Sequence, residues 1–338
     1  MKREYGVVLI GCGHIGEEYM RDIYFREGIR IVGVVDTDRS RAGLFARKYG
    51  AESCGTEYLP YLDRGDVDIV IIATYVSTHA SILRECLKRG KHVVCEKPIG
   101  RSLAEGRAFV GLVKNSPCKV LVSYVLRYNE TYRTAARLIQ SGAIGSVKMM
   151  RMVQNHHAKD WPRYRNLLKD CPPIVDCGVH YMDVMQWFTG SKVTAVDGFG
   201  AVIDDDLPEG EYNYGVIHVR LENGAAGYYE SGWSKTLASS NVKEFVGDRG
   251  RLSITLGGFR SKDAEEGDLI ELYTYEGNRY EAFNVRAKYK DMWAELRQLI
   301  RMIETGAPAV PTIGEVYSTF ETVLRADAAV RARLFGRG

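Results

Sequence analysis

A glycine-rich hexapeptide near the start of the chain, Gly11-Cys12-Gly13-His14-Ile15-Gly16, restricts the possible folds more than any other feature of the sequence. It follows the apolar run Val7–Ile10, which is typical of a buried strand, and it opens a helical pattern over Ile15–Phe25. Glycines at this spacing permit a tight turn, let the backbone approach a pyrophosphate and allow close helix–strand packing. The helix N-terminus supplies free amides. The segment therefore predicts a dinucleotide-binding loop, with cofactor contacts from Gly11, Gly13, His14, Ile15 and Gly16.

An aspartate follows the second apolar run. Asp36 lies twenty residues after Gly16 and ends the predicted strand Ile29–Val35. A carboxylate at that place accepts hydrogen bonds from the adenosine ribose of NAD and would repel the 2′-phosphate of NADP. We therefore expect NAD as the cofactor, with NADP less favoured, although Arg39 and Arg41 weaken the preference. The alternative interpretation is a glycine turn and a helix-capping aspartate.

The first 125 residues alternate apolar runs with helical patterns, which is typical of a parallel sheet covered on both faces. We predict the α/β class, with a doubly wound Rossmann domain over residues 1–125. Residues 126–338 should form an α+β domain with a large, mostly antiparallel open sheet that binds substrate and forms subunit contacts. The final helices are candidates for packing on the N-terminal domain. The predicted strands of the first domain are Val7–Ile10, Ile29–Val35, Val67–Ala73, His92–Cys95 and Val120–Val122.

The composition of the chain limits the kinds of partner that we expect it to bind. The formal net charge is +3 over 338 residues, which is too near neutral for a general nucleic-acid or membrane-surface binder. The N-terminus lacks the apolar core of a signal peptide, no apolar run is long enough to span a membrane, and the seven cysteines contain no Cys-x-x-Cys pair. We therefore expect a cytoplasmic protein without nucleic-acid or membrane partners. The aromatic-rich later strands, with Tyr228, Tyr229 and Trp233, predict a homodimer or homotetramer.

Lys97 is the first candidate for chemistry. The predicted strand His92–Cys95 runs directly into Glu96-Lys97-Pro98. Ligands of doubly wound folds bind outside the carboxyl ends of the strands, so Lys97 should face the cofactor. A cationic nicotinamide would disfavour the ammonium form and suit the lysine to acid/base work. The alternative is a surface lysine in a turn.

Asp176 and His180 form the second candidate. They lie four residues apart in the predicted helix Val175–Phe188 and should share one face. A carboxylate and an imidazole there could bind adjacent sugar hydroxyls, and the histidine could hold the proton of the alcohol. The alternatives are a capping aspartate with a core histidine, or two metal ligands. Because no third ligand follows at a matching spacing, we predict no metal.

These segments together resemble the glucose–fructose oxidoreductase/inositol dehydrogenase (Gfo/Idh/MocA) family: Gly11–Gly16, Asp36, Glu96-Lys97-Pro98 and Asp176-x-x-x-His180-x-x-Asp183. The resemblance covers nearly the whole chain. It implies that Lys97, Asp176 and His180 line the substrate site, with Lys97 as the acid/base or alcohol-polarising residue, His180 as its proton partner and Asp176 as a ligand of a substrate hydroxyl. It also implies substrate contacts from Arg127 and Tyr128 and cofactor contacts from Thr74, Tyr75, His79, Glu96 and Lys97.

The chain departs from the family pattern at two places. The family usually has Thr-Pro-Asn where this chain has Thr74-Tyr75-Val76, so the contact to the nicotinamide ribose must differ. A glycine-rich run usually precedes the aspartate, and Cys171-Pro172-Pro173 replaces it here. Two prolines impose a stiff, extended approach to the helix and change the shape expected for the pocket.

A basic segment offers the one clue to the substrate. Residues 147–170 carry six Lys or Arg and two Asp, with Trp161 among them. The segment favours an acidic or phosphate-bearing sugar, with Trp161 stacking on the sugar ring; the alternatives are a solvated basic loop or a subunit contact. Asp204-Asp205-Asp206 is interpreted as a solvated hairpin turn.

The family resemblance implies an NAD-dependent oxidoreductase that oxidises a secondary alcohol of a sugar, cyclitol or sugar derivative, or reduces the ketone. One alternative is a redox-neutral enzyme in which tightly bound NAD allows transient oxidation, followed by elimination or glycoside cleavage. Another is a non-catalytic NAD-linked sensor, against which Lys97 and His180 argue.

Overall fold

The computed structural model of the chain describes residues 3–261 and 265–336. It divides into two compact units. Unit 1 comprises Met1–Tyr128 and Lys290–Tyr317, and unit 2 comprises Asn129–Tyr289 and Ser318–Gly338. The first division lies three residues beyond the expected boundary, and unit 1 also takes a segment from near the end of the chain.

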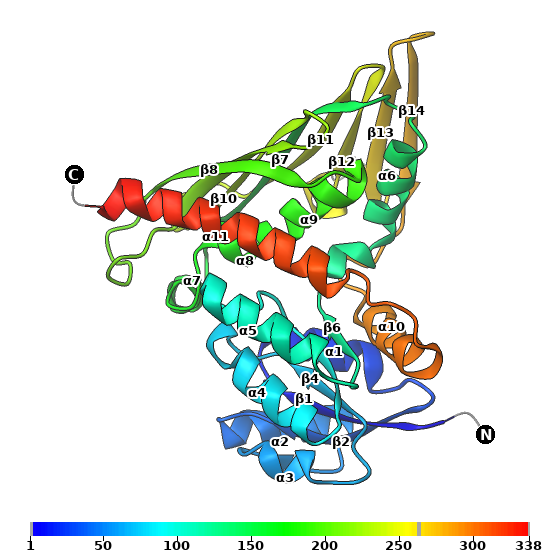
Figure 1. Cartoon of the computed structure of the whole chain (residues 1–338), viewed down its shortest axis with the longest axis vertical. Helices are drawn as coiled ribbons and strands as arrows, with labels where there is room; N and C mark the ends of the chain where they lie inside the picture. The colour runs from blue at the N-terminus through cyan, green and yellow to red at the C-terminus, as the bar shows by residue number, and fades with distance from the viewer. Residues whose placement is uncertain (1–2, 262–264, 337–338) are drawn as a thin grey trace. The chain divides into compact units, whose positions relative to one another are not determined.

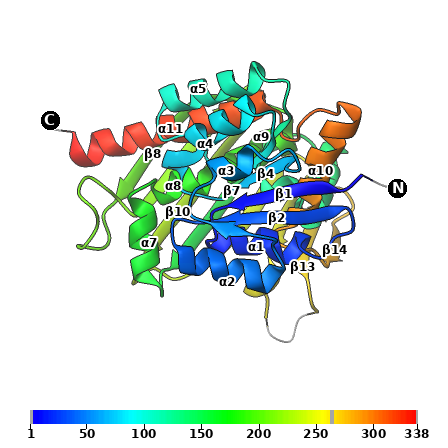
Figure 2. The same ribbon diagram turned by 90° about the horizontal axis from the view of Figure 1, so that it is seen from below.

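Unit 1 contains a six-stranded sheet in the order β3-β2-β1-β4-β5-β6, and every pair of neighbouring strands is parallel. Continuous apolar strands suit this sheet because both of its faces are buried. Figure 2 shows α1 and α2 on one side of β1 and β2, and α4 and α5 on the other. The predicted doubly wound fold is confirmed. Its elements are β1 (Tyr5–Ile10), α1 (His14–Ile23), β2 (Ile29–Val35), α2 (Arg39–Tyr49), β3 (Cys54–Gly55), α3 (Leu59–Leu62), β4 (Ile69–Ile72), α4 (Val76–Lys88), β5 (His92–Cys95), α5 (Leu103–Lys114), β6 (Val120–Val122), the 3-10 turn η1 (Val125–Arg127) and α10 (Met292–Thr305).

Parallel strands place all their carboxyl ends at one edge of the sheet. β1 lies between β2 and β4, so the chain leaves β1 at the point where the strand order changes direction. Gly11, Asp36, Glu96 and Ser123 each directly follow a strand at this edge. Ligands of doubly wound folds bind at such a point.

Unit 2 is built on an eight-stranded sheet in the order β14-β13-β12-β11-β7-β10-β9-β8. The β7–β10 pair is parallel and the other pairs are antiparallel, as expected for a mostly antiparallel sheet. The strands are β7 (Val147–His157), β8 (Val193–Ala201), β9 (Tyr214–Leu221), β10 (Ala226–Ser234), β11 (Ser240–Gly247), β12 (Gly250–Thr255), β13 (Asp268–Thr274) and β14 (Arg279–Val285). The helices are α6 (Glu130–Gln140), α7 (Trp161–Leu168), α8 (Pro173–Asp176), α9 (Gly178–Thr189) and α11 (Ile313–Phe335), which begins in unit 1, with the 3-10 turn η2 (Gly257–Phe259).

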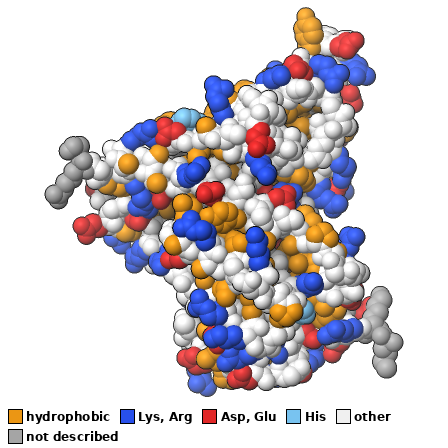
Figure 3. All heavy atoms as spheres, in the orientation of Figure 1, with side chains coloured by type: hydrophobic (Ala, Val, Ile, Leu, Met, Phe, Trp, Pro, Cys, Tyr) orange, Lys and Arg blue, Asp and Glu red, His pale blue; other side chains and the backbone are white. Residues whose placement is uncertain are grey.

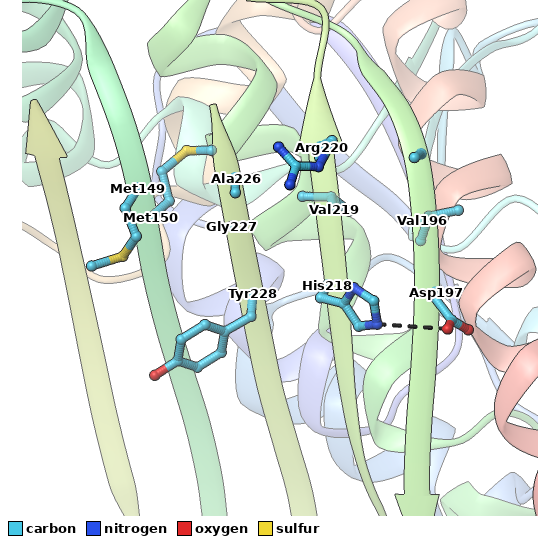
Figure 4. Close-up of a pocket in the computed structure, with 11 residues that line it drawn as sticks. Met149, Met150, Val196, Asp197, His218, Val219, Arg220, Ala226, Gly227 and Tyr228 are labelled. Atoms are coloured by element: carbon cyan, nitrogen blue, oxygen red, sulfur yellow. Dashed lines mark ion pairs between the residues drawn. The ribbon is translucent and has the colours of Figure 1, made fainter. Parts of the chain in front are cut away.

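Helices cover one face of the unit 2 sheet and leave the other open (Figure 1). On the covered face, Tyr181 of α9 stacks on Tyr229 at a ring separation of 4.6 Å. Tyr229 and Trp233 are both buried on this side, because alternate residues of β10 point to opposite faces. Of the three aromatic residues expected to favour subunit contacts, Tyr228 alone points to the open face (Figure 4). The other two belong to the core of unit 2.

The surface mixes both signs of charge. Figure 3 shows Lys and Arg side chains interspersed with Asp and Glu over the visible face. No helix in the described part of the chain has the length and apolar character needed to cross a membrane.

Candidate cofactor and substrate sites

The glycine loop has the geometry of a phosphate cradle. Gly11 has φ +101°, and a Cβ added there would lie 2.4 Å from the carbonyl oxygen of Ala73. At Gly16, a Cβ would lie 2.1 Å from the carbonyl oxygen of Gly11, so both positions exclude side chains. At Gly13, a Cβ would meet nothing within 4 Å. Gly13 caps α1 without a side-chain hydrogen bond, so the helix amides remain for a pyrophosphate, next to the exposed His14 and half-buried Ile15.

Two backbone amides fix the Asp36 carboxylate beside this loop. Its Oδ2 accepts a 2.8 Å hydrogen bond from the Cys12 amide, and its Oδ1 accepts one of 2.9 Å from the Asp38 amide. A carboxylate has about four acceptor positions, so capacity remains for ribose hydroxyls. Arg41 lies 3.8 Å from Oδ2 and is the group that would attract a 2′-phosphate. The residues therefore fit a dinucleotide.

His79 joins the loops that follow β4 and β5. Its Nδ1 lies 3.0 Å from the carbonyl oxygen of Pro98, and its Nε2 lies 3.0 Å from that of Thr74. The side chain is buried, so it holds the backbone on both sides of the predicted nicotinamide site. Tyr75 starts α4 with its side chain half exposed.

Lys97 follows β5 at the carboxyl edge and is half-buried, after a cysteine and a glutamate that are buried. The Lys97–Pro98 peptide bond is cis. Lys97 thus lies at the carboxyl edge of the sheet, and both its direction toward the cofactor and its catalytic role stay predictions.

Glu96, which directly precedes Lys97, and Glu295 form a pair of buried carboxyl groups that the sequence interpretation did not predict. Glu295 of α10 accepts hydrogen bonds from the hydroxyls of Tyr19, at 2.8 Å, and Ser123, at 3.0–3.1 Å. Burial, together with the charge of the neighbouring Glu96, raises the pKa of Glu295 to about 8. Burial also raises the pKa of Glu96, which Lys97 and Lys290 lower. The pair therefore holds a proton near neutral pH.

Arg127 and Tyr128, the expected substrate contacts, have partners within unit 1. Arg127 is buried and lies 3.1 Å from Glu315, and the Tyr128 hydroxyl donates to the carbonyl oxygen of Val310. Arg127 thus contacts the first turn of α11, and Tyr128 contacts the segment between α10 and α11. A contact to substrate stays a prediction for each.

In unit 2, Asp176 and His180 lie on either side of a helix break. α8 ends at Asp176 and α9 begins at Gly178, so the expected continuous helix over Val175–Phe188 is wrong. Cys177 nevertheless has helical angles, and the His180 amide donates to its carbonyl oxygen at 3.1 Å. Asp176 at the end of α8 and His180 in the first turn of α9 therefore remain in consecutive helical turns, and both side chains are half-buried. The Asp176 carboxylate accepts a 3.4 Å hydrogen bond from the Cys177 thiol. Pro172 has an extended backbone conformation and is the N-cap of α8, and Pro173 is the first residue of this helix.

Aromatic rings border this part of unit 2. The Tyr164 ring lies 6.1 Å from that of His156 and 5.6 Å from that of Trp233. Burial lowers the pKa of His156, which Asp176 raises and Lys243 lowers. His156 therefore lies within electrostatic range of both Asp176 and a buried lysine that the sequence interpretation overlooked.

Trp161 and the three-aspartate segment form a network. The Trp161 indole donates to Asp206 at 2.8 Å, and the Lys235 ammonium lies 5.3 Å from the centre of its ring. Asp204 is buried and accepts a 2.7 Å hydrogen bond from Asn213, so the interpretation of a solvated turn is wrong at that residue. Its carboxylate is needed inside the fold to satisfy the Asn213 amide.

The basic segment does not gather its charges into a pocket. All six Lys and Arg side chains of residues 147–170 are exposed. Arg151 pairs with Glu244 at 3.0 Å, and the Arg165 guanidinium donates to the backbone of Asp206. Three or more His, Cys, Asp or Glu side chains do not come together as a metal-binding group in residues 3–261 or 265–336.

A hollow of about 400 Å³ lies on the open face of the sheet, and none of the expected site residues lines it. Figure 4 shows Met149, His218, Arg220 and Tyr228 on β7, β9 and β10, pointing to the side away from the helices. His218 lies 3.7 Å from Asp197, which also pairs with Arg333 at 2.6 Å.

Comparison with known families agrees with both units. Residues 5–124 match the model described as "Oxidoreductase family, NAD-binding Rossmann fold", and residues 132–253 match the "GFO/IDH/MocA C-terminal domain". The chain belongs to the Gfo/Idh/MocA family. The N-terminal unit is thus the NAD-binding domain of an oxidoreductase, in agreement with the glycine cradle and Asp36.

Several Gfo/Idh/MocA relatives are named as cyclitol dehydrogenases. The scyllo-inositol 2-dehydrogenase (NAD(+)) of Bacillus subtilis is 26% identical over 260 residues, which cover 75% of each chain. The myo-inositol 2-dehydrogenase of Thermotoga maritima is 22% identical and covers 89% of this chain and 88% of its own. The scyllo-inositol dehydrogenase of Lactobacillus casei, solved with NAD(H) and scyllo-inositol, has a TM-score of 0.78 at 18% identity and covers 98% of each chain.

Proposed function

We propose that this protein is an NAD-dependent oxidoreductase that oxidises a secondary alcohol of a cyclitol, sugar or sugar derivative, or reduces the corresponding ketone. The observation that carries the proposal is the position of Lys97 at the carboxyl edge of the sheet that bears the glycine cradle. The names of the inositol dehydrogenase relatives support the substrate class.

In this proposal the dinucleotide, which Gly11, Gly13, Gly16 and Asp36 would hold, would supply the acceptor for the hydride of the carbinol C–H bond. Lys97 takes the hydroxyl proton, so that the alcohol becomes a ketone. His180 is the proton partner of Lys97, Asp176 binds a neighbouring hydroxyl, and Trp161 is a candidate surface for the sugar ring. Glu96 lies within electrostatic range of Lys97, where its negative charge stabilises the protonated amine.

We also propose that NAD is preferred over NADP, because the Asp36 carboxylate would repel a 2′-phosphate. All seven cysteines are free, as a reducing cytoplasm would keep them, and the cytoplasm stays our expectation. The thiols nearest the cofactor loop do not suggest nucleophilic chemistry, because burial raises the pKa of Cys12 to about 12.

We infer that the partner on the open face of unit 2 is a second copy of the chain. Met149 of β7 and Phe199 of β8 are exposed there, and the half-exposed Tyr228 lies between them in the sheet order. An uncovered sheet face with apolar side chains is typical of a subunit interface. We expect a homodimer or a homotetramer.

The experiment that tests the activity is a screen for NADH formation. The purified protein is mixed with inositols, neutral sugars and uronates, with NAD and NADP in parallel, and absorbance at the NADH band is followed. We expect reduction of NAD by at least one polyol, and loss of that signal in Lys97→Met. Trapped NADH without net oxidised product would instead identify the redox-neutral alternative. If no polyol reduces either cofactor, the proposal is wrong.

A further inference from the structure

Lys243 is a buried lysine on the helix-covered face of the unit 2 sheet. It lies on β11 opposite Met152 of β7, and its side chain is 1% exposed. Phe245, two residues further and therefore on the same face, stacks on Phe188 of α9 at 4.9 Å. The Lys243 ammonium lies 5.1 Å from the centre of the Tyr181 ring, also on α9. The charged end therefore points into the core beneath the helix that carries His180.

No carboxylate of the described residues lies within 4 Å of the Lys243 ammonium to form an ion pair. Its hydrogen bond is to the side-chain oxygen of Asn241, on the same strand. Asp268 is the carboxylate that raises the pKa of Lys243, but it already accepts hydrogen bonds from Thr131, at 2.7 Å, and from the Gly257 amide, at 2.8 Å. Burial lowers the pKa of Lys243 to about 7, because a buried ammonium without a counter-ion is costly.

Two buried hydroxyls lie in the same region. The Tyr132 hydroxyl of α6 and the Tyr181 hydroxyl of α9 have no hydrogen-bond partner among the described residues. Both side chains are at most 1% exposed, and each affects the pKa of the other. Nearly all buried polar groups in proteins are paired, so two buried hydroxyls near a buried ammonium need an explanation. Each of the three groups can donate a hydrogen bond.

The region adjoins the substrate residues proposed above. Tyr181 directly follows His180, and the His156 imidazole is affected by the charges of both Asp176 and Lys243. His156 therefore lies within electrostatic range of both Asp176 and the Lys243 ammonium. Carboxylates and phosphates are common anionic hydrogen-bond acceptors of metabolites, and the near-complete burial of the three donors favours the smaller, planar carboxylate.

We propose that Lys243, Tyr132 and Tyr181 form a subsite for a carboxylate of the substrate, so that the preferred substrates are polyhydroxy acids such as uronates. The inference rests on the proposed function, because it places the carboxylate on the substrate of that reaction. In this proposal the preference for acidic substrates comes from the buried Lys243, and not from the exposed Lys and Arg side chains of residues 147–170. Lys243 is a specificity-determining residue in this scheme and takes no part in the transfer of the alcohol proton.

The test compares pairs of sugars that differ only at one carbon. Isothermal titration at pH 6.5, with the protein loaded with NADH so that the alcohol cannot be oxidised, measures Kd for glucose against glucuronate, galactose against galacturonate, and mannose against mannuronate. At least one acid should bind about 10–100-fold more tightly than its neutral counterpart, as expected for hydrogen bonds to a charged group. Lys243→Met, which keeps an unbranched side chain one atom shorter and removes the charge, should reduce that ratio to near one.

Two further variants separate the subsite from general charge and packing effects. Tyr181→Phe keeps the ring against Tyr229 and removes one donor, so it should reduce the acid-to-neutral ratio several-fold. Lys148→Met removes an exposed lysine of β7 and should leave the ratio unchanged. The proposal is overturned if no acid binds more tightly than its neutral counterpart, or if Lys243→Met retains the ratio.

Three outcomes keep this proposal distinct from others. If glucose 6-phosphate binds more tightly than every uronate, and does so through Lys243, the subsite takes phosphate and the carboxylate proposal is wrong. If neutral polyols reduce NAD but acids gain no affinity, the subsite is wrong and the proposed function stands. If acids bind through Lys243 but no polyol reduces NAD, the subsite stands and the proposed function is wrong.

Discussion

Tyr19 of α1 donates a 2.8 Å hydrogen bond to Glu295 of α10, a residue 276 positions further along the chain. Ser123 contacts both oxygens of the same carboxyl group. Its one hydroxyl proton can be donated to only one of them at a time, and a protonated Glu295 can itself donate to the Ser123 oxygen. The geometry therefore suits a neutral carboxylic acid beside the buried Glu96.

Glu295→Gln should make the stability of the protein less dependent on pH. Below about pH 4.5 the carboxyl is protonated in both the folded and unfolded states. Between pH 4.5 and about 8 the unfolded chain loses this proton and the folded protein keeps it, so the free energy of unfolding falls by up to ~1.4 kcal/mol per pH unit. Above pH 8 the loss stays constant. The amide avoids this loss, so thermal unfolding should show Glu295→Gln matching the unmodified protein at pH 4.5 and exceeding its Tm by several degrees at pH 8.

Glu304→Gln is the matched control, because Glu304 is exposed on the same helix. Its Tm should follow that of the unmodified protein at every pH. A Tm difference for Glu295→Gln that does not grow with pH would show that Glu295 is charged in the folded state.

Asp36→Ser should reduce the preference for NAD over NADP. The change removes the negative charge that would repel a 2′-phosphate and leaves Arg41 to attract it. Kd values for both cofactors, measured by titration of intrinsic fluorescence, should show weaker NAD binding and a ratio shifted toward NADP by about tenfold or more. Asp38→Ser is the control, because Asp38 caps α2 through the Ser40 amide. Tighter binding of NADP than NAD by the unmodified protein would contradict the role given to Asp36.

Lys97→Met should slow hydride transfer by ~10²–10⁴-fold, the usual cost of losing a general acid/base. NAD binding should change little, because the pyrophosphate lies at the glycine loop on β1 and not at β5. His180→Ala should also slow the chemistry, and Asp176→Ala should mainly raise KM. The double variant of Lys97 and His180 should lose less than the product of the single losses if both act on one proton. Single-turnover NADH formation measures these rates. A near-normal rate for Lys97→Met would show that Lys97 has no catalytic role and is only a lysine in a turn.

Tyr228→Glu should break the expected dimer. The side chain lies on the open face, where a charge would have to be buried against the second copy. Light scattering after gel filtration at micromolar concentration should give a dimer or tetramer for the unmodified chain and a monomer for the variant. Glu276→Gln, in the exposed turn between β13 and β14, should leave the mass unchanged. A monomeric unmodified protein would show that the open face has another use.

The sequence predicts the fold of unit 1 well because its strands are continuous apolar runs, which the burial of both faces requires. It gives no sign of β3, whose two residues Cys54 and Gly55 have no strand pattern. The glycine loop and Asp36 were also predictable, since each position has a steric or electrostatic reason of its own. The break at Cys177 was not, because periodicity continues through a single residue that keeps helical angles.

The buried charges were harder to find. Along β11, Asn241, Lys243 and Phe245 face the helices while Val242 and Glu244 face the other way, so each face mixes polar and apolar residues and alternation does not reveal the inner one. The sequence around Glu295 gives a clearer indication that this residue is buried. Glu295 falls three residues after Met292 and four before Leu299, within the apolar stripe of α10, where a charged residue needs a buried partner.

The division of unit 1 between the two ends of the chain affects the order in which the protein can be made. The Rossmann sheet is complete at β6, but the glutamate that pairs with Tyr19 and Ser123 is translated some 170 residues later. A ribosome that has released only the first 128 residues has therefore produced a sheet whose hydroxyls still lack their partner and whose surface for α10 is uncovered. The NAD-binding domain can therefore be completed only after nearly the whole polypeptide has been translated, and until then chaperones would encounter it without α10.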